Sequence, residues 1–156
     1  MSNVIELDID LANNLGQRAN TETPALVHRF IQLSGARPCD QIIIAGAAHL
    51  EHLIALTRRG FARVSCQSPE HSPHVPNSKA DALFAPSVTG EAQLLSLLDG
   101  LGSRVLPGGA LIVAAPDLAG DKLNAALLAH GFGALEPMGD GLWRARKQQI
   151  PMVRAA

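Results

Sequence analysis

Histidine, serine and cysteine side chains are the residues of this chain whose types and spacing could support chemistry. His49 and His52 are three residues apart, and His71 and His74 repeat the same HxxH spacing. Four imidazoles around one point would suit Zn²⁺ or a similar metal ion. The simpler interpretation, which we favour, places His49 at a turn, His52 on a solvated helix face and the other two in an exposed loop.

A nucleophile is the second chemical hypothesis. Ser87 or Cys66 could act with His49 as base, because all three lie near the carboxyl ends of expected strands, where open α/β sheets build their sites. The chain has no GxSxG elbow, however, and a cysteine at a strand end is typical of buried packing. Asp81 is expected to begin a strand and Asp117 to cap a helix. We therefore predict no metal site and assign no catalytic residue.

Composition excludes several classes of function. Of 156 residues, 47% are hydrophobic and 17% are charged, with a net charge of −1, which is typical of one folded domain. Basic and aromatic residues are scattered, so we expect no nucleic-acid binding. The acidic start and the short apolar stretches predict a cytoplasmic protein with no membrane span. Cys39 and Cys66 lack CxxC spacing and are expected to be reduced thiols.

The elements that must position these residues begin with a helix and a strand. Thr23 as N-cap, Pro24 at the first helical position and Gly35 at the end bound an amphipathic helix. The apolar run at residues 41–46 fills both faces of a pleat and predicts a central parallel strand.

A second helix follows, in which Leu50, Leu53, Ile54 and Thr57 repeat at helical spacing before Gly60 ends it. The remaining expected elements, in chain order, are strand 63–66, loop 67–79, strand 82–85, a leucine-striped helix at 94–101, a turn at 107–109, strand 110–115, a helix ending at 130–131, and a hairpin of 133–137 with 142–147.

This alternation predicts an α/β domain with a mostly parallel sheet and an antiparallel end. We assign residues 1–36 to an N-terminal extension that carries the amphipathic helix, residues 37–150 to the α/β domain and residues 151–156 to a tail. All three belong to a single domain in this prediction.

Four stretches resemble class I S-adenosylmethionine (SAM)-dependent methyltransferases. Residues 42–60, IIIAGAAHLEHLIALTRRG, resemble the family's first strand, glycine loop and first helix. Residues 80–86 resemble its fourth strand, residues 94–113 its leucine-rich helix with PGG and apolar strand, and residues 127–146 its last helix and hairpin. The resemblance implies a three-layer, mostly parallel Rossmann-like sheet with a C-terminal antiparallel hairpin, shortened by about one βα unit.

The resemblance also implies SAM as the cofactor, held at the carboxyl edge of the sheet. Methyl transfer from a sulfonium is an in-line displacement that depends on proximity and desolvation, so it requires no special acid. The residues that the resemblance places around the cofactor are Gly46, Ala47, Ala48, His49, Gln67, Pro86 and Ser87.

Several positions depart from the family's pattern. Ile44 stands where the family has an acidic residue, and Ala48 and Leu50 replace two glycines of its loop. The family ends its second strand with a carboxylate that accepts hydrogen bonds from both ribose hydroxyls, where this chain has Cys66 or Gln67. These departures imply weak or lost cofactor binding.

Two functions stay open. The first is a SAM-dependent methyltransferase-like protein with weak or lost cofactor binding, whose substrate, small molecule or protein, is unknown. The alternative is a non-catalytic module that uses the fold for interaction or self-association. In that case the shortened sheet leaves its second strand as an open edge, where a second copy of the chain would pair to form a homodimer.

Overall fold

One mixed sheet organises the part of the chain that the computed structural model describes, which is residues 23–45, 50–68, 79–133 and 135–149. Six strands lie in the order β2-β1-β3-β4-β6-β5. Their bounds are β1 (Ile42–Ala45), β2 (Val64–Gln67), β3 (Ala80–Ala85), β4 (Val105–Ala114), β5 (Glu136–Gly139) and β6 (Leu142–Arg146). The helices are helix 23–34, α2 (Leu50–Arg58), α3 (Glu91–Leu101) and α4 (Gly120–Ala129), with a 3₁₀ turn at Gly102–Arg104. None of these described helices is long and apolar enough to cross a bilayer.

The centre of the sheet is parallel and its end is antiparallel. β1 pairs in parallel with β2 and β3, and β3 pairs in parallel with β4. β6 runs antiparallel to both β4 and β5, which confirms the predicted C-terminal hairpin. Asp140 and Gly141 have φ angles of 56° and 73°, as the two central residues of a type I′ turn require.

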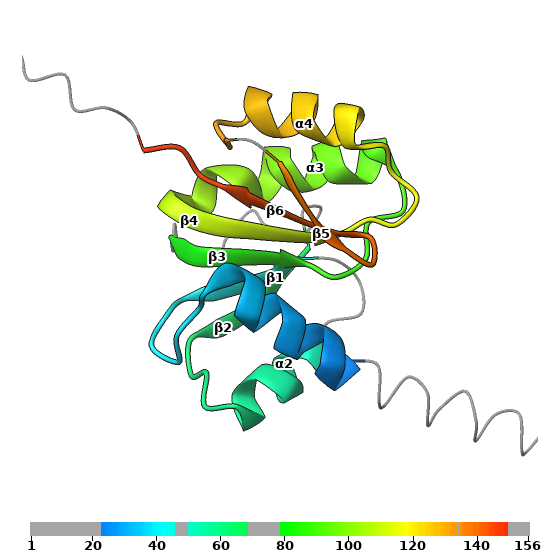
Figure 1. The fold of residues 1–156 in the computed structure, drawn as a ribbon. Coiled ribbons are helices and arrows are strands. Elements are labelled where there is room, and N and C mark those ends of the chain that lie inside the picture. The colour runs from blue at the N-terminus through cyan, green and yellow to red at the C-terminus, as the bar shows by residue number, and fades with distance from the viewer. Residues whose placement is uncertain (1–22, 46–49, 69–78, 134, 150–156) are drawn as a thin grey trace, which may run out of the picture.

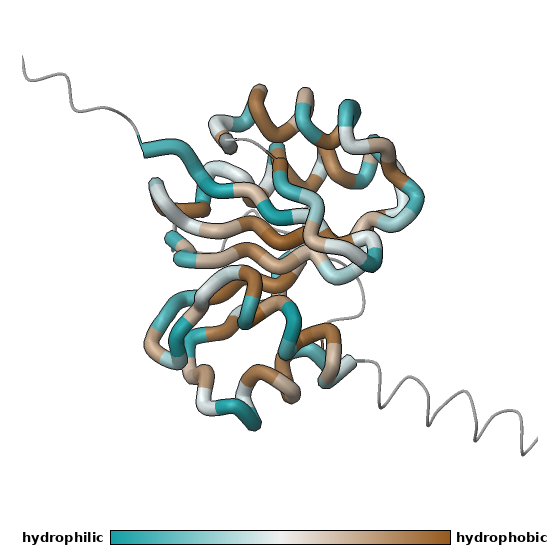
Figure 2. The backbone as a smooth tube through the Cα atoms, viewed as in Figure 1, coloured by the Kyte–Doolittle hydropathy of each residue, from teal (hydrophilic) through white to brown (hydrophobic). Residues whose placement is uncertain are grey.

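Helices cover both faces of the sheet (Figure 1). Helix 23–34 and α2 lie on one face, and α3 and α4 lie on the other. Along β1, Ile42 and Ile44 belong to the core of the first face, whereas Ile43 and Ala45 belong to the core of the second. Figure 2 shows hydrophobic residues along the central strands between the two layers. This two-sided burial explains why the strand has no polar position.

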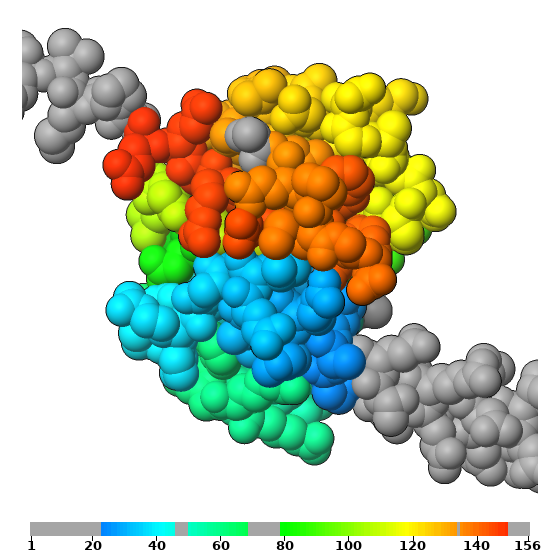
Figure 3. Space-filling view, viewed as in Figure 1, coloured from blue at the N-terminus to red at the C-terminus, as the bar shows by residue number. Residues whose placement is uncertain are grey.

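Helix 23–34 is fastened to the hairpin at its C-terminal end. Phe30, on the inner side of this helix, is buried. The surface of the helix adjoins the surface of the hairpin (Figure 3). Arg144 donates to the carbonyl of Leu33 over 3.2 Å, and Arg146 donates to that of Ser34 over 3.4 Å. Cationic donors suit this end because the last carbonyls of a helix have no partner within it.

His130 and Lys147 join the ends of α3 and α4. Nδ1 of His130 lies 2.9 Å from the carbonyl oxygen of Ala126, and Nε2 lies 2.7 Å from the carboxylate of Asp99. Only the imidazolium donates to both acceptors, so these contacts raise the pKa of His130. Lys147 donates to the carbonyls of His130 and Gly102 over 2.8 and 3.0 Å, and burial lowers the pKa of its ammonium.

The predicted turn at residues 107–109 is instead a bulge within β4, so this part of the sequence prediction is wrong. The register of β4 against β3 shifts here, and Gly108 has a φ of 81°. Gly109 has no room for a side chain, because a Cβ atom would lie 2.7 Å from Cγ1 of Val105 and 2.9 Å from a backbone oxygen of β3. Gly108 and Gly109 therefore lie inside the single strand β4, and no turn precedes residue 110.

The residues of α2 that are buried are not the ones whose spacing predicted the helix. Ala55 and Leu56 are its buried residues, whereas Leu50 is 68% exposed and Ile54 is 41% exposed. The spacing correctly predicted a helix, but the side of α2 that packs on the sheet is the side that carries Ala55 and Leu56.

We expect Gly109→Ala to lower the free energy of unfolding by about 1–3 kcal/mol, because the new methyl group meets backbone that has no space to move. Gly102→Ala is the matched control, since its Cβ would meet its nearest atoms at 3.7 Å, an ordinary contact. We expect a change below about 1 kcal/mol there. Urea unfolding followed by circular dichroism measures both, and equal losses would contradict the assigned bulge packing.

We expect the stabilisation by His130 to depend on pH. Because its pKa is raised in the folded state, the stabilisation is complete below the unfolded pKa of about 6.5 and is lost as pH rises through the folded pKa. The loss in unfolding free energy caused by His130→Gln should be about 0.5–1 kcal/mol larger at pH 5.5 than at pH 8.5. Asp99→Asn should reduce this pH dependence. A loss that is equal at both pH values would disprove the assignment.

Candidate functional site

The carboxyl ends of β1, β2, β3 and β4 meet at one edge of the sheet, because these strands are parallel. Open α/β sheets bind their ligands at this edge. Ala45 ends β1 beside Gln67, which ends β2, and Ala85 ends β3. Of the cofactor residues predicted from the sequence, Gly46, Ala47, Ala48 and His49 lie outside the described residues, whereas Gln67, Pro86 and Ser87 lie within them.

Gln67 is a buried polar residue of this edge. The residue is only 6% exposed, and Arg104 donates a hydrogen bond to its amide oxygen. Its amide nitrogen donates to Oγ of Ser65 over 3.4 Å. β2 ends one residue later than predicted, so Gln67 and not Cys66 is the strand's last residue. The amide oxygen of this predicted cofactor residue is therefore bound by a guanidinium of the same chain.

Gln67 and Cys66 point to opposite faces of the sheet. Gln67 pairs with Ala45, which belongs to the core on the α3 side, and parallel partners share a face. Cys66 pairs with Ile44 and points to the α2 side, where it is exposed and not packed in the core as expected. Partial burial still raises the pKa of its thiol. A thiol with a raised pKa stays protonated at neutral pH and is a poor nucleophile.

Pro86 and Ser87 follow β3 in a loop that is anchored on both sides. Val88 is buried, and its amide donates to the carbonyl of Ala114 over 3.0 Å. The side chain of Gln93 donates to the carbonyl of Ser87 over 3.3 Å. Ser87 itself is exposed, so the loop presents it at the carboxyl edge. Its predicted base, His49, lies outside the described residues.

Within the described ranges, no three His, Cys, Asp or Glu residues are grouped closely enough to hold a metal ion. His52 is half-buried in α2 and its Nε2 atom is buried, so the solvated position expected for it is wrong. The other histidines of the HxxH pairs, His49, His71 and His74, lie outside the described residues.

The two candidate aspartates have positions that do not favour acid or base chemistry. Asp81 lies near the start of β3, as expected, and accepts the amide hydrogen of Gln41 over 2.8 Å. This bond ties the amino ends of β1 and β3 together, away from the carboxyl edge. Asp117 was expected to cap α4, but that helix begins at Gly120 without a side-chain cap, so this prediction is wrong.

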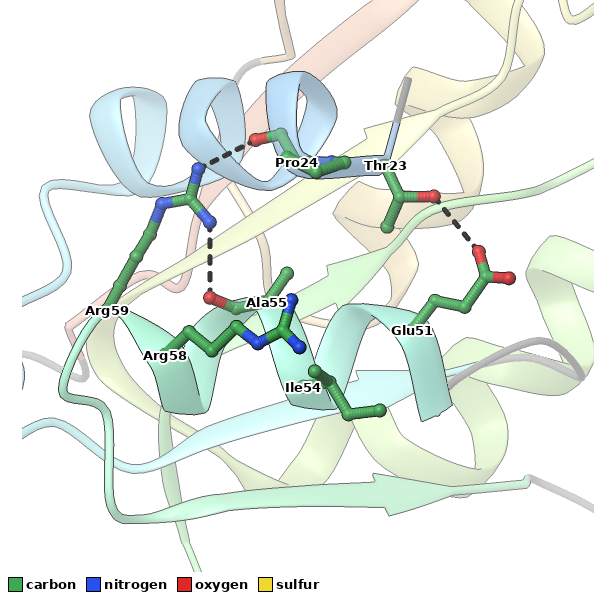
Figure 4. Close-up of a pocket in the computed structure, with 7 residues that line it drawn as sticks. All are labelled: Thr23, Pro24, Glu51, Ile54, Ala55, Arg58 and Arg59. Carbon is green, nitrogen blue, oxygen red and sulfur yellow. Dashed lines mark hydrogen bonds between the residues drawn. The ribbon is translucent and has the colours of Figure 1, made fainter. Parts of the chain in front are cut away.

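A groove of about 330 Å³ lies between helix 23–34 and α2 (Figure 4). Thr23, the predicted N-cap, is itself helical, and its hydroxyl donates to Glu51 over 3.1 Å. Arg59 donates to the carbonyls of Pro24 and Ala55 over 3.0 and 3.1 Å. These bonds join the two helices, so we interpret the groove as a structural junction. Its lining residues are Thr23, Pro24, Glu51, Ile54, Ala55, Arg58 and Arg59.

Solved structures of methyltransferases share this fold. A sugar N-methyltransferase from Streptoalloteichus sp. ATCC 53650 matches with a TM-score of 0.59 and 12% identity, over 82% of this chain and 87% of that one. Magnesium protoporphyrin IX methyltransferase from Synechocystis PCC 6803, with bound SAH, gives 0.57 and 13%, over 95% and 89%. A SAM-bound amino pentose methyltransferase from Micromonospora echinaspora gives 0.53 and 13%, over 83% and 91%. The chain has the class I SAM-dependent methyltransferase fold.

The methyltransferase fold is present here in a shortened form. Residues 68–79 alone connect β2 to β3, which is too short for the second helix, third strand and third helix of the family. Among the described strands, β2 is an edge of the sheet. No family model and no curated protein matches the sequence, so the similarity to methyltransferases is one of fold.

Arg104, which bonds Gln67 from the amino end of β4, was not predicted from the sequence. It lies one residue before β4 and 37 positions after Gln67. No local sequence pattern links Gln67 to Arg104, because the two residues meet only after folding places the chain that follows α3 on the same face of the sheet as Gln67.

We expect Gln67 and Arg104 to be energetically coupled. Arg104→Met should lower the free energy of unfolding by about 1–3 kcal/mol, since it removes a donor from a buried amide oxygen. The Gln67→Met/Arg104→Met double variant should lose about 1 kcal/mol less than the sum of the single variants. Lys79→Met, which removes an exposed bond to the carbonyl of Ser103, is the control and should not couple to Gln67. Additive losses for Gln67 and Arg104 would refute the contact.

Proposed function

We propose that this protein is a methyltransferase-fold protein that binds SAM and S-adenosylhomocysteine (SAH) only weakly, at the carboxyl edge of its sheet. The observation that carries this proposal is the bond from Arg104 to the buried Gln67 at the end of β2. The methyltransferase resemblance places a ribose-binding carboxylate at this position. Here the residue is neutral and its oxygen is already bound, so it fits the ribose poorly.

The size of this effect follows from the strength of charged hydrogen bonds. A hydrogen bond to a charged group contributes about 1.5–3 kcal/mol, and each 1.4 kcal/mol corresponds to about tenfold in affinity. Replacing the carboxylate by an occupied amide should therefore weaken binding by about tenfold to a hundredfold. The fold similarity to SAM-bound and SAH-bound methyltransferases supports the choice of ligand. The sequence adds the expectation of a cytoplasmic protein, but it does not indicate the substrate.

Calorimetric titration with SAM and SAH at near-millimolar concentration tests the proposal. We expect a dissociation constant of about 0.1 mM or weaker for the natural sequence. The Gln67→Glu/Arg104→Gln variant restores a carboxylate and removes the competing guanidinium, so we expect about tenfold or more tighter binding. Arg104→Gln alone is the matched control, and it should change affinity much less because it adds no charge.

Two outcomes would overturn the proposal. Micromolar binding by the natural sequence, abolished by Gly46→Val, would mean that the loop after β1 holds the cofactor without help from β2. No heat and no thermal shift with either the natural sequence or the double variant would mean that the cofactor site is lost.

The second candidate function is a non-catalytic interaction module on the same scaffold. The position of β2 at the edge of the described strands favours it, because a strand edge with no neighbour is a template for pairing with another chain. Self-association through β2 would give a mass that rises with concentration in analytical ultracentrifugation. A monomer mass at all concentrations would exclude the homodimer.

A further inference from the structure

The two edges of the sheet differ in how well they are protected. β5 contains Pro137 and pairs with β6 across a register shift, and both features hinder the addition of a further strand. β2 has neither proline nor charge and pairs with β1 in continuous register. Within the described residues, no strand pairs with the other side of β2. β2 is thus the edge to which an extended segment can add.

Apolar side chains border this edge on the α2 side. Leu53 of α2 is half-buried and packs against the same core as Val64, the first residue of β2. Cys66 lies on the same face of β2 and is exposed. An apolar strand face beside β2 would extend this core outward.

The sequence before helix 23–34 contains a segment with the pattern of such a strand. Residues 5–11, IELDIDL, alternate between apolar and acidic residues without interruption. In an extended conformation the apolar side chains lie on one face and the carboxylates on the other. The apolar residues are Ile5, Leu7, Ile9 and Leu11, and the acidic residues are Glu6, Asp8 and Asp10.

We propose that residues 5–11 of the same chain add to the open side of β2 as the outermost strand of the sheet. The apolar face then continues the core to which Leu53 and Val64 belong, on the side to which Cys66 points. The acidic face lies on the α3 side, where the guanidinium of Arg104 reaches Gln67.

Charge and chain length both support this occupant. Residues 61–68, which contain β2, carry Arg63 as their one charged residue, so three carboxylates meet a neutral to basic surface there. Thr23, at which the described residues begin, is bonded to Glu51 in the first turn of α2. Residues 12–22 extend up to about 35 Å, which allows the segment to pass around α2 to its other side.

Disulfide trapping with the natural Cys66 tests the predicted strand and its facing. In a full-length Cys39→Ser background, Leu7→Cys and Ile9→Cys place a thiol on the face of Cys66, whereas Asp8→Cys is the matched control on the opposite face. After mild oxidation, peptide mass spectrometry measures each disulfide. We expect position 7 or 9 to form an intrachain disulfide with Cys66 in at least tenfold higher yield than position 8.

The other outcomes of this experiment overturn the proposal. Equal yields at the three positions would indicate random collision of a free segment. Disulfides between two chains, with a dimer mass, would identify a second copy as the occupant of the edge. No disulfide with Cys66 at any position would show that the segment does not reach β2.

Hydrogen exchange gives a second test that needs no introduced cysteine. Leu7→Asp/Ile9→Asp should speed exchange of the β2 amides, Val64–Gln67, by about tenfold or more, and should leave the central strand β3 unchanged. Asn14→Asp adds a charge outside the segment and should have no effect. Unchanged exchange in β2 would overturn the proposal. Neither test involves SAM, so failure here is distinct from failure of the proposed cofactor binding.

Discussion

Burial of β1, β3 and β4 on both faces is the constraint from which the arrangement of the other elements follows. Each large apolar side chain taken out of water contributes about 1.5–3 kcal/mol, and these strands point such side chains in both directions. A single layer of helices would leave half of them in water. Helix 23–34 therefore belongs to the core as much as α2 does, since Val27 and Phe30 are fully buried against the sheet. The segment described from sequence as an extension supplies part of one layer.

The same constraint explains the polar end of β2. This strand lies beside α2 on one face, but no helix of the described residues covers its end on the α3 side. Ser65 and Gln67 point to that side, and Arg104 reaches across to bond the buried amide. A polar network takes the place of apolar packing, as buried polar groups must be hydrogen-bonded.

The sequence predicted those elements whose cause is local. Ile42–Ala45 is an apolar run that fills both faces of a strand. Asp140-Gly141 is a residue pair that favours the positive φ angles of a two-residue hairpin turn. The position of Pro86 and Ser87 after β3 was likewise predictable, because a proline ends the apolar run. A family resemblance over residues 40–146 then gave the order of the layers.

Features that depend on distant partners were not predictable in this way. Pro107-Gly108-Gly109 suits a turn and a bulge equally, and the pairing of β4 with β3 decides between them. The repeat in α2 gives its period, but contact with the sheet decides that Ala55 and Leu56 are buried and Leu50 is not. The contact between Gln67 and Arg104 joins positions with no common motif. The predicted cofactor loop, Gly46 to His49, stays a prediction.

The attachment of helix 23–34 to the hairpin has a consequence for the order of folding during synthesis. Arg29 donates to the carbonyl of Met138, and Arg144 and Arg146 bond the last turn of the helix, across more than 100 positions of sequence. A domain generally folds as a unit, and the chain leaves the ribosome from its N-terminal side at about 5–20 residues per second. This helix is made among the first elements, yet its last turn receives these donors only after β6 has emerged. The layer that it forms is completed late, so nascent chains that stop before the hairpin would leave the carbonyls of Leu33 and Ser34 without these donors.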